Sequence, residues 1–252
     1  MPEGDTIRRI ANRLDATLTG QRLRVSTPSG RGKVEALTRL DGRVLAQVKT
    51  HGKHLLLDFG ELILHSHLGM NGSWRLYQTG QQWDRSAATA WVVLAGEHDV
   101  AAQFGGPTLR LLRRGQLTLD PRLATLGLDI LAPGFSRSEA VAALRTGDQH
   151  RALGEALLDQ QLVAGIGNIF KCESCFAAAV NPWRPLAQVN DGELGEVLMQ
   201  AREQMLAAVA VGRKGFAVYG RRGSCIRCGA SVRRRGQGDA NRTTWWCESC
   251  QR

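Results

Sequence analysis

The first chemically suggestive residues are Pro2 and Glu3, because initiator methionines are usually removed when the next residue is small. Removal of Met1 leaves a secondary amine at the N-terminus, and free α-amino groups have pKa values near ~7.7–8.0. A useful fraction is then neutral and nucleophilic at neutral pH, next to a carboxylate that can move protons. The pair indicates either a reactive centre or an ordinary chain start, and on its own it favours the ordinary start.

Four cysteines near the end of the chain have the spacing of a metal site. Two CxxC pairs are separated by 18 residues and comprise Cys225, Cys228, Cys247 and Cys250. Four thiolates in this pattern are typical of a tetrahedral structural Zn²⁺ site, with each pair in a tight turn and a hairpin between them. The alternatives are two disulfides or free thiols. Four protein ligands leave no open position, so we predict one structural zinc ion per chain.

A third CxxC, formed by Cys172 and Cys175, lies in a stretch with helical spacing. It permits redox chemistry, but no thioredoxin-like strand precedes it, so buried cysteines that pack a helix are the favoured interpretation. Just before it, the turn AGIGN at residues 164–168 opens a helix at Asn168. Its glycines let a backbone come close, and N–H groups at a helix start can bind phosphate. A plain connection between helices is the alternative.

Two further residues stand at turns between strand-like runs. Lys53 lies in THGKH, where a lone lysine is normally solvated, and Met70 lies at the tip of HSHLGMNGSW. An apolar residue at a loop tip can act as a wedge between bases. The alternative is that Met70 folds back onto the core.

The charge of the chain is concentrated at its end. The 252 residues carry a net charge of +10, and residues 213–252 hold ten Lys or Arg against two acids, so they account for +8. Such a cluster favours a polyanionic partner, because neutralised phosphates release counterions. A solvated basic tail is the alternative. No apolar run is long enough for a bilayer and no signal peptide is evident, so we expect a cytoplasmic protein without membrane contact.

The hydrophobic pattern predicts three structural parts. Residues 4–19 have the spacing of one amphipathic helix, and short apolar runs from 21 to about 118 predict an antiparallel sandwich or barrel. Beyond residue 132, four segments predict helices, and a third part begins near residue 216. The predicted helical segments are SRSEAVAALRTG, RALGEALLDQQ, GNIFKCESCFAAAV and DGELGEVLMQAREQMLAAVAVG.

Taken together, PEGDTIRR, THGKHLLL, HSHLGMNG, LVAGIGNIF and NRTTWWCESC closely resemble the formamidopyrimidine-DNA glycosylase and endonuclease VIII family. The motifs follow the family's order over essentially the whole chain, and PEGDT resembles the endonuclease VIII branch. The resemblance implies an α+β multidomain fold. We expect a catalytic β-sandwich domain with a flanking helix at 1–118, a linker at 119–132, a helix–two-turns–helix domain at 133–215 and a four-cysteine zinc finger at 216–252.

The resemblance also implies an activity and the residues that carry it. Family members excise oxidised bases from damaged DNA and cut the abasic strand by β- or β,δ-elimination, so the chain is expected to be a bifunctional DNA glycosylase and AP (apurinic/apyrimidinic site) lyase. It is expected to act as a monomer in a bacterial cytoplasm, associated with the nucleoid when on DNA, and to need no small-molecule cofactor. The matched residues are Pro2 as nucleophile, Glu3 as acid, Lys53 and Arg242 as catalytic phosphate-binding cations, and His67, Met70 and Asn168 as DNA contacts.

Two other classes of protein remain as alternatives. A DNA-lesion binder with weak catalysis would keep the fold and the finger, but it has no need for a processed N-terminal proline beside Glu3. A zinc-ribbon transcription or translation factor would explain the four cysteines but would leave the N-terminus unaccounted for. Several positions depart from the family pattern, namely Thr6, Gly69, Asn71 and Thr125.

Overall fold

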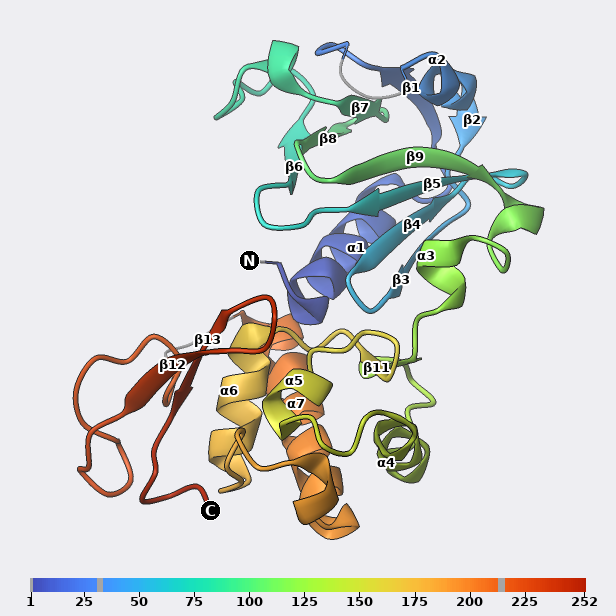
Figure 1. The fold of residues 1–252 in the computed structure, drawn as a ribbon. Helices are drawn as coiled ribbons and strands as arrows, with labels where there is room; N and C mark the ends of the chain where they lie inside the picture. Colours follow the sequence, from blue (N-terminus) through green and yellow to red (C-terminus); the bar gives the residue numbers. More distant parts are fainter. Residues whose placement is uncertain (1, 31–33, 213–215) are drawn as a thin grey trace. The chain divides into compact units, whose positions relative to one another are not determined.

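The computed structural model describes residues 2–30, 34–212 and 216–252 (Figure 1). The chain forms two compact units, one of Pro2 and Thr6–Ala124 and the other of Glu3–Asp5 and Thr125–Arg252. Met1, whose removal is expected, and the basic residues Arg213 and Lys214 lie outside the described residues. The domain limits expected at residues 118, 132 and 215 stay predictions.

The first unit is built on two antiparallel sheets. One sheet has the strand order β2-β1-β7-β8-β6 and the other the order β3-β4-β5-β9. The strands are β1 (Arg22–Ser26), β2 (Arg43–Val44), β3 (Gln47–His51), β4 (His54–Asp58), β5 (Leu62–His67), β6 (Ser73–Gln78), β7 (Val92–Ala95), β8 (Asp99–Phe104) and β9 (Thr108–Arg113). The predicted sandwich is therefore confirmed.

Alternation of apolar side chains explains how these strands pack. Leu55 and Leu57 of β4 are fully buried, and they join Leu64 of β5 and Leu94 of β7 in the main core of the unit. Side chains of a strand alternate between its two faces, so this spacing directs one face of each sheet inward. The core is closed by the helix α1 (Gly4–Leu18), whose residues Ile7, Ala11, Leu14 and Leu18 are buried at helical spacing. The helix predicted over 4–19 is confirmed.

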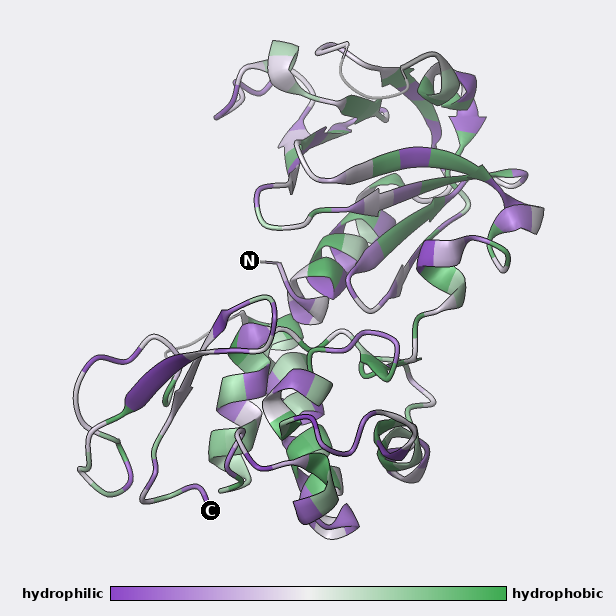
Figure 2. Ribbon diagram, viewed as in Figure 1, coloured by the Kyte–Doolittle hydropathy of each residue, from purple (hydrophilic) through white to green (hydrophobic). Residues whose placement is uncertain are grey.

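This unit also contains the short α-helices α2 (Val34–Leu37) and α3 (Pro121–Ala124). The second unit contains the helices α4 (Arg137–Thr146), α5 (Leu153–Ala156), α6 (Asn168–Ala177) and α7 (Asp191–Val211), together with the parallel pair β10 (Leu128–Asp129) and β11 (Val163–Ala164). Green hydrophobic bands on α6 and α7 mark the sides that form its core (Figure 2).

Local sequence signals account for the starts of α4 and α7, which have side-chain caps. The side chain of Asn190 accepts a hydrogen bond from the Glu193 N–H, and the Glu193 side chain accepts one from the Asn190 N–H, so α7 starts with a full capping box. The helix predicted over residues 151–161 is wrong, because α5 has only four residues. Ala152 bridges Pro185 just before the helix, and beyond it the N–H groups of Leu158 and Asp159 donate only three residues back, which closes a turn.

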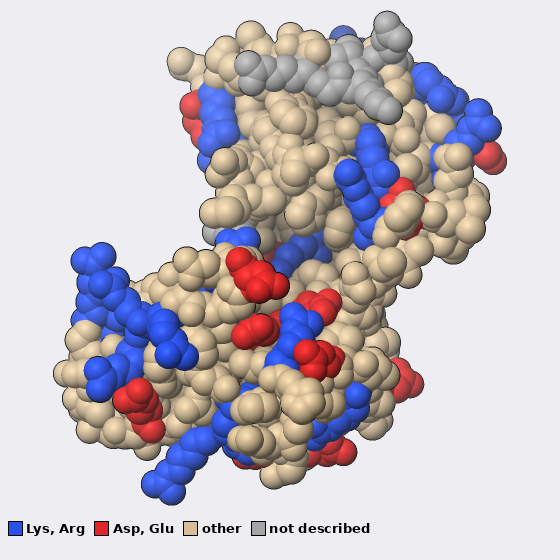
Figure 3. Space-filling model, in the orientation of Figure 1, with Lys and Arg blue, Asp and Glu red and all other residues tan. Residues whose placement is uncertain are grey.

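The last part of the chain is a two-stranded hairpin of β12 (Arg233–Gln237) and β13 (Arg242–Trp246). It lies between the two cysteine pairs, as the sequence predicts. Lys and Arg side chains gather over this hairpin in the space-filling view (Figure 3). Among the described residues, no helix is both long and apolar enough to cross a membrane.

Candidate active site

Glu3 is fixed at the start of α6 by backbone hydrogen bonds. Its side chain has no exposed surface, and its two oxygens accept from the N–H groups of Ile169 at 2.9 Å and Phe170 at 3.3 Å. These N–H groups have no partner within the helix, and the N-cap residue is Gly167, which has no side chain to supply one. The Glu3 carboxylate therefore caps α6, and the positive end of the helix dipole stabilises its negative charge.

The glycines of the AGIGN turn make this approach possible. A Cβ atom on Gly167 would overlap the carboxyl group of Glu3. The N–H of Gly4 donates to the Gly165 carbonyl at 3.0 Å, and a Cβ on Gly4 would lie 3.1 Å from both Cα and O of Gly165. The prediction that the turn allows close approach is confirmed. The prediction that its N–H groups are open to phosphate is wrong for Ile169 and Phe170, because the chain's own carboxylate binds them.

Pro2, the predicted nucleophile, directly precedes Glu3 and is half-buried. Asn168, the first residue of α6, donates from Nδ2 to the Thr243 carbonyl of β13 at 2.7 Å. This bond joins the AGIGN turn to the residue next to Arg242, the predicted phosphate-binding arginine, which is also half-buried. The structure thus brings Glu3 and Asn168 to one helix end and bonds Asn168 to Thr243, which follows Arg242 in β13.

Lys171 is a buried cation that the sequence analysis missed. Its side chain has no exposed surface, and its Nζ donates to Thr244 Oγ1 at 2.5 Å and to Gln237 Oε1 at 3.4 Å. Burial lowers the pKa of the Lys171 amine, whereas the Glu3 carboxylate is among the groups that favour its charged form. No sequence signal marks this residue, because a lysine one turn into a helix is usually solvated.

Glu173, also missed, secures the chain that enters the finger. Its buried carboxylate accepts from three consecutive N–H groups, those of Ala217, Val218 and Tyr219, at 2.9, 2.9 and 2.6 Å. A carboxylate holding three N–H groups fixes the backbone of this segment.

In the first unit, the predicted contacts Lys53 and His67 lie near each other. Lys53 is half-buried in the turn between β3 and β4. Burial and then the positive charges of Lys53 and Arg122 lower the pKa of His67. This end of the sheet is therefore electropositive and suits an anionic ligand.

Behind His67 lies a chain of neutral histidines. His54 packs against His67 with ring centroids 4.6 Å apart, and His54 Nδ1 lies 2.8 Å from His65 Nε2. Arg110 Nε always donates, and it bonds to His65 Nδ1 at 3.1 Å, so the proton of a neutral His65 is on Nε2 and donates to His54. Burial, followed by neighbouring positive groups, lowers the pKa of His54 to about 3 and that of His65 to about 4.

Met70 lies on the loop between β5 and β6 and is 64% exposed, so the interpretation that it folds back onto the core is wrong. Its loop is held in place by glycines. Gly69 has a φ of +55°, and a Cβ there would lie 2.7 Å from Pro107 Cδ. Gly72 donates its N–H to the Leu68 carbonyl at 2.8 Å. The loop therefore presents Met70 to solvent on a fixed support.

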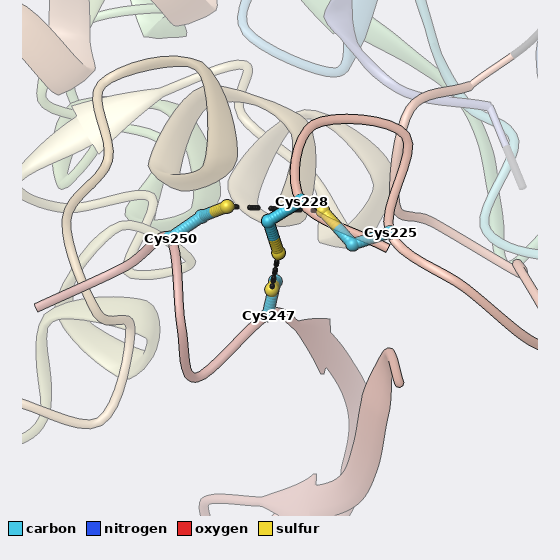
Figure 4. A group of neighbouring side chains, drawn as sticks. All are labelled: Cys225, Cys228, Cys247 and Cys250. Atoms are coloured by element: carbon cyan, nitrogen blue, oxygen red, sulfur yellow. Dashed lines mark hydrogen bonds between the residues drawn. The ribbon is translucent and has the colours of Figure 1, made fainter. Parts of the chain in front are cut away.

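The four cysteines of the finger converge on one point (Figure 4). Their sulfur atoms all lie within 4.8 Å of one another, with 3.8 Å between Cys225 and Cys250 and 3.6 Å between Cys228 and Cys247. Zn–S bonds of about 2.3 Å in a tetrahedron require S–S edges of about 3.8 Å. The four thiols are free, so all four are available to a zinc ion. In contrast, Cys172 and Cys175 are fully buried in α6, which confirms that they pack the helix.

Comparisons with known proteins agree with this arrangement. The formamidopyrimidine-DNA glycosylase N-terminal domain matches residues 1–107, and the formamidopyrimidine-DNA glycosylase H2TH domain matches residues 126–219. The "Probable endonuclease 8 2" of Streptomyces coelicolor is 40% identical, with 100% of this chain and 94% of the relative covered. The chain belongs to the formamidopyrimidine-DNA glycosylase and endonuclease VIII family.

Other members of this glycosylase family are similar over their full length. The "DNA-(apurinic or apyrimidinic site) lyase Nei2" of Mycolicibacterium smegmatis is 34% identical, with 100% of this chain and 99% of that protein covered. The "Formamidopyrimidine-DNA glycosylase" of Laribacter hongkongensis is 31% identical, with both chains fully covered. The higher identities to proteins named endonuclease 8 confirm the expected branch, and the relatives' names confirm a family of glycosylases and AP lyases.

Solved structures confirm the glycosylase fold. The structure of the Lactococcus lactis Fpg protein bound to an abasic site containing DNA matches with a TM-score of 0.85, 23% identity and both chains fully covered. A structure of MutM in complex with carbocyclic 8-oxo-G containing DNA matches with a TM-score of 0.82, 22% identity and full coverage of both chains. The predicted β-sandwich, helix–two-turns–helix domain and four-cysteine finger are therefore all present.

Proposed function

We propose that this protein removes oxidised bases from DNA and cleaves the resulting abasic strand through a Schiff base on Pro2. The observation that supports this most directly is the position of Glu3, which is buried and capped onto α6 directly after the proposed nucleophile. An ordinary chain start gives no reason to bury a carboxylate in this way, because uncompensated burial of a charge is costly. A fixed acid beside the N-terminal amine suits acid–base chemistry.

The proposed reaction begins with a base out of the stack, because C1′ of the sugar is otherwise out of reach. The neutral Pro2 amine attacks C1′, and the C1′–N bond to the damaged base breaks. The base leaves with the electron pair of that bond and takes a proton from water. The Glu3 carboxylate accepts the proton that the attacking amine loses and passes it to the ring oxygen as the sugar opens, which leaves a covalent iminium between Pro2 and C1′. This type of amine–carbonyl intermediate divides one difficult step into two easier ones.

Strand cleavage follows from the positive charge of the iminium. That charge acidifies the proton on C2′, and its removal expels the 3′ phosphate in a β-elimination. A second elimination can release the 5′ phosphate, and water then frees Pro2. In this proposal Lys53 and Arg242 stabilise phosphate charge as it develops, as cations fixed in an active site do. Asn168 and His67 hold the DNA backbone, and Met70 fills the space that the flipped base leaves.

The four finger cysteines would hold one structural Zn²⁺ ion, because their sulfur separations fit a tetrahedral ion. The ion would supply folding energy to the finger and take no part in bond making. Loss of the ion would release the hairpin that carries Arg242, so zinc content and DNA binding should fall together.

Borohydride trapping tests the proposed chemistry. The protein is incubated with duplex DNA that contains an abasic site, and borohydride then reduces any iminium to a stable adduct. We expect an adduct with the processed chain and none with a chain that has one extra residue before Pro2. Glu3→Gln should slow trapping by ~10²-fold or more, the contribution typical of a positioned acid. The exposed Glu97 provides the matched control Glu97→Gln, which should trap normally.

A lack of adduct at high protein concentration, with removal of Met1 verified by mass spectrometry, would falsify the proposal. If the same sample still bound the abasic duplex, the protein would instead be a lesion-binding member of the fold. Initial rates on duplexes with oxidised pyrimidines and purines would then identify the preferred bases.

A further inference from the structure

Strand β9 is the last strand of its sheet and lies next to β5 (Figure 1). Within the described residues, no strand pairs with its other edge. A cavity of about 570 Å³ lies at that edge, and its lining includes six consecutive residues, Pro107 and the first five residues of β9. Side chains of a strand point alternately to its two faces, so a cavity that touches all six residues follows the backbone edge itself. This cavity is the β9 groove.

The backbone of Leu109 and Leu111 faces the β9 groove. The N–H of Arg114, one residue beyond β9, donates to the carbonyl of Glu61 at 2.9 Å. Bonded and non-bonded pairs alternate along an antiparallel ladder, so residues 108, 110 and 112 bond to β5, and residues 109 and 111 face away from it. Among the described residues, no group bonds to the backbone of Leu109 or Leu111 on that side. An edge of this kind is a template for pairing with another chain.

One wall of the β9 groove is cationic. Thr108 and Arg110 are alternate residues of β9 and project from the same face of the sheet. Arg122 of α3 lies on this side too, because it donates from its guanidinium to Thr108 Oγ1 at 3.1 Å. Asp120 pairs with Arg110 at 2.5 Å, but it is buried and does not line the groove. No carboxylate of the described residues forms an ion pair with Arg122, so its charge is available to an anionic ligand.

The opposite wall of the β9 groove is apolar. The side chains of Leu109 and Leu111 project from the other face of β9 and pack in the core of the sandwich. Trp91 is half-buried and packs against the same core, and together with Ala36 of α2 it lines the groove. An extended chain in the groove would therefore direct alternate side chains to the apolar wall and to the cationic wall.

We propose that the β9 groove binds an extended acidic peptide of a partner protein as a fifth strand of the sheet. The peptide backbone bonds to Leu109 and Leu111, as in other complexes formed by strand addition. Acidic side chains at every second position meet Arg110 and Arg122, and the apolar side chains between them meet Trp91. The six lining residues span about 17 Å at about 3.4 Å per residue, which sets the length of the bound segment at about six residues. This inference does not rest on the proposed function.

Charge and backbone chemistry favour such a peptide over other occupants. The strand β9 reads TLRLLR, with two arginines and no acid, so two copies paired through β9 would bring like charges together, which destabilises a strand pair. DNA would offer phosphates to the cationic wall, but it would leave the apolar wall and the outward carbonyl groups without partners. A peptide with alternating acidic and apolar residues complements all three features of the groove.

The test uses the full chain and the fluorescein-labelled peptide Gly-Val-Asp-Val-Glu-Val-Asp-Gly, with binding measured by fluorescence anisotropy. We expect saturable binding, and binding at least tenfold weaker for the scrambled peptide Gly-Asp-Glu-Asp-Val-Val-Val-Gly, which keeps the composition and loses the alternation. Two further peptides carry N-methyl groups on the three valines or on the three acidic residues. One set of N–H groups faces β9 and the other faces solvent, so only one methylated peptide should lose binding. Equal affinities of the two methylated peptides, or no saturation up to about 1 mM of the parent peptide, would overturn the inference.

Charge reversal locates the peptide on the cationic wall. Arg122→Glu should weaken binding of the acidic peptide about threefold or more and tighten binding of a peptide with lysines in place of its acids, as expected for exposed ion pairs. Arg24→Glu makes the same change of net charge at an exposed residue of β1 that does not line the groove, and it should leave both affinities as in the wild type. Equal effects of the two variants would contradict binding in the groove.

Amide exchange followed by NMR tests strand addition without any variant. Saturating peptide should slow exchange of the Leu109 and Leu111 amides at least tenfold and leave that of the Arg110 amide, already bonded to β5, unchanged. Unchanged exchange at Leu109 and Leu111 would overturn the inference. So would displacement of the peptide by an abasic duplex together with an equal loss of duplex binding in Arg122→Glu, because the groove would then belong to the DNA surface. A chain with one extra residue before Pro2, which is expected not to trap, should bind the peptide as the wild type does, so the two proposals fail separately.

Discussion

The neutral histidine chain of the sandwich predicts a specific acid sensitivity. A buried histidine whose native pKa lies below its unfolded value of about 6.5 resists a proton that the unfolded chain accepts. Stability from such a group is complete above the unfolded pKa and is lost as the pH falls toward the native pKa. For His54 that window runs from about 6.5 down to about 3, and for His65 from about 6.5 down to about 4.

The magnitude follows from these values. One pKa unit corresponds to about 1.4 kcal/mol. Lowering the pH from 7.5 to 5.5 should therefore reduce the free energy of unfolding by about 1.4 kcal/mol for each histidine. Together His54 and His65 should lower the free energy of unfolding of the sandwich by roughly 2–3 kcal/mol over this interval. That corresponds to about a 100-fold fall in amide protection in β4 and β5, after correction for intrinsic exchange rates.

Hydrogen exchange with mass spectrometry on peptides from residues 54–67 measures this fall locally. The double variant His54→Gln and His65→Asn keeps polar acceptors, including one for Arg110, but removes two titrating groups. It should be less stable at pH 7.5 and lose at most about tenfold protection by pH 5.5, since His67 still titrates. His98→Gln, at a site where the side chain is 81% exposed, should behave like the wild type. A threefold or smaller fall in the wild type, or an equal fall in the double variant, would refute the reasoning.

Three further changes should have separable effects. Gly167→Ala places a methyl group where the Glu3 carboxyl lies, so borohydride trapping should fall at least tenfold while zinc content stays at one ion per chain. Removal of metal with a chelator should abolish binding to an abasic duplex and leave the circular dichroism of the sandwich in place, since structural zinc sites stabilise only the element they close. Met70→Ala should slow excision from duplex DNA. Because the side chain is exposed, the substitution should change the free energy of unfolding by less than ~0.5 kcal/mol. An equally slow excision from single-stranded substrate would argue against a wedge.

Local patterns predicted the elements that depend on neighbours in the chain. The buried stripe of Ile7, Leu14 and Leu18 repeats at helical spacing, and the cysteine pairs enclose the hairpin that their spacing requires. The helix expected over residues 151–161 is shorter because Ala152 pairs with Pro185, some thirty residues away, and so stays extended. Periodicity carries no information about such partners.

The candidate site was predictable as a set of residues but not as an arrangement. The motif resemblance singled out Glu3 and Asn168, yet the bond from Glu3 to Ile169 spans 166 positions and leaves no trace in local sequence. Lys171 was missed for the same reason, because its burial depends on Gln237 of β12 and Thr244 of β13, which are distant in the chain. Contacts of this length appear only once the tertiary packing is known.

Because the two cysteines of α6 are buried, a thiol reagent should reach only the four finger cysteines in the native chain. Burial raises the pKa of Cys172 to about 11 and raises that of Cys175 further, so neither sulfur is exposed or ionised at neutral pH. A colorimetric disulfide reagent reacts with thiolates, which zinc would protect in the finger. The native chain should therefore release no chromophore, and the metal-stripped native chain should release four equivalents, while all six cysteines react only after denaturation. The same titration would report the occupancy of the metal site in any preparation used for the DNA experiments.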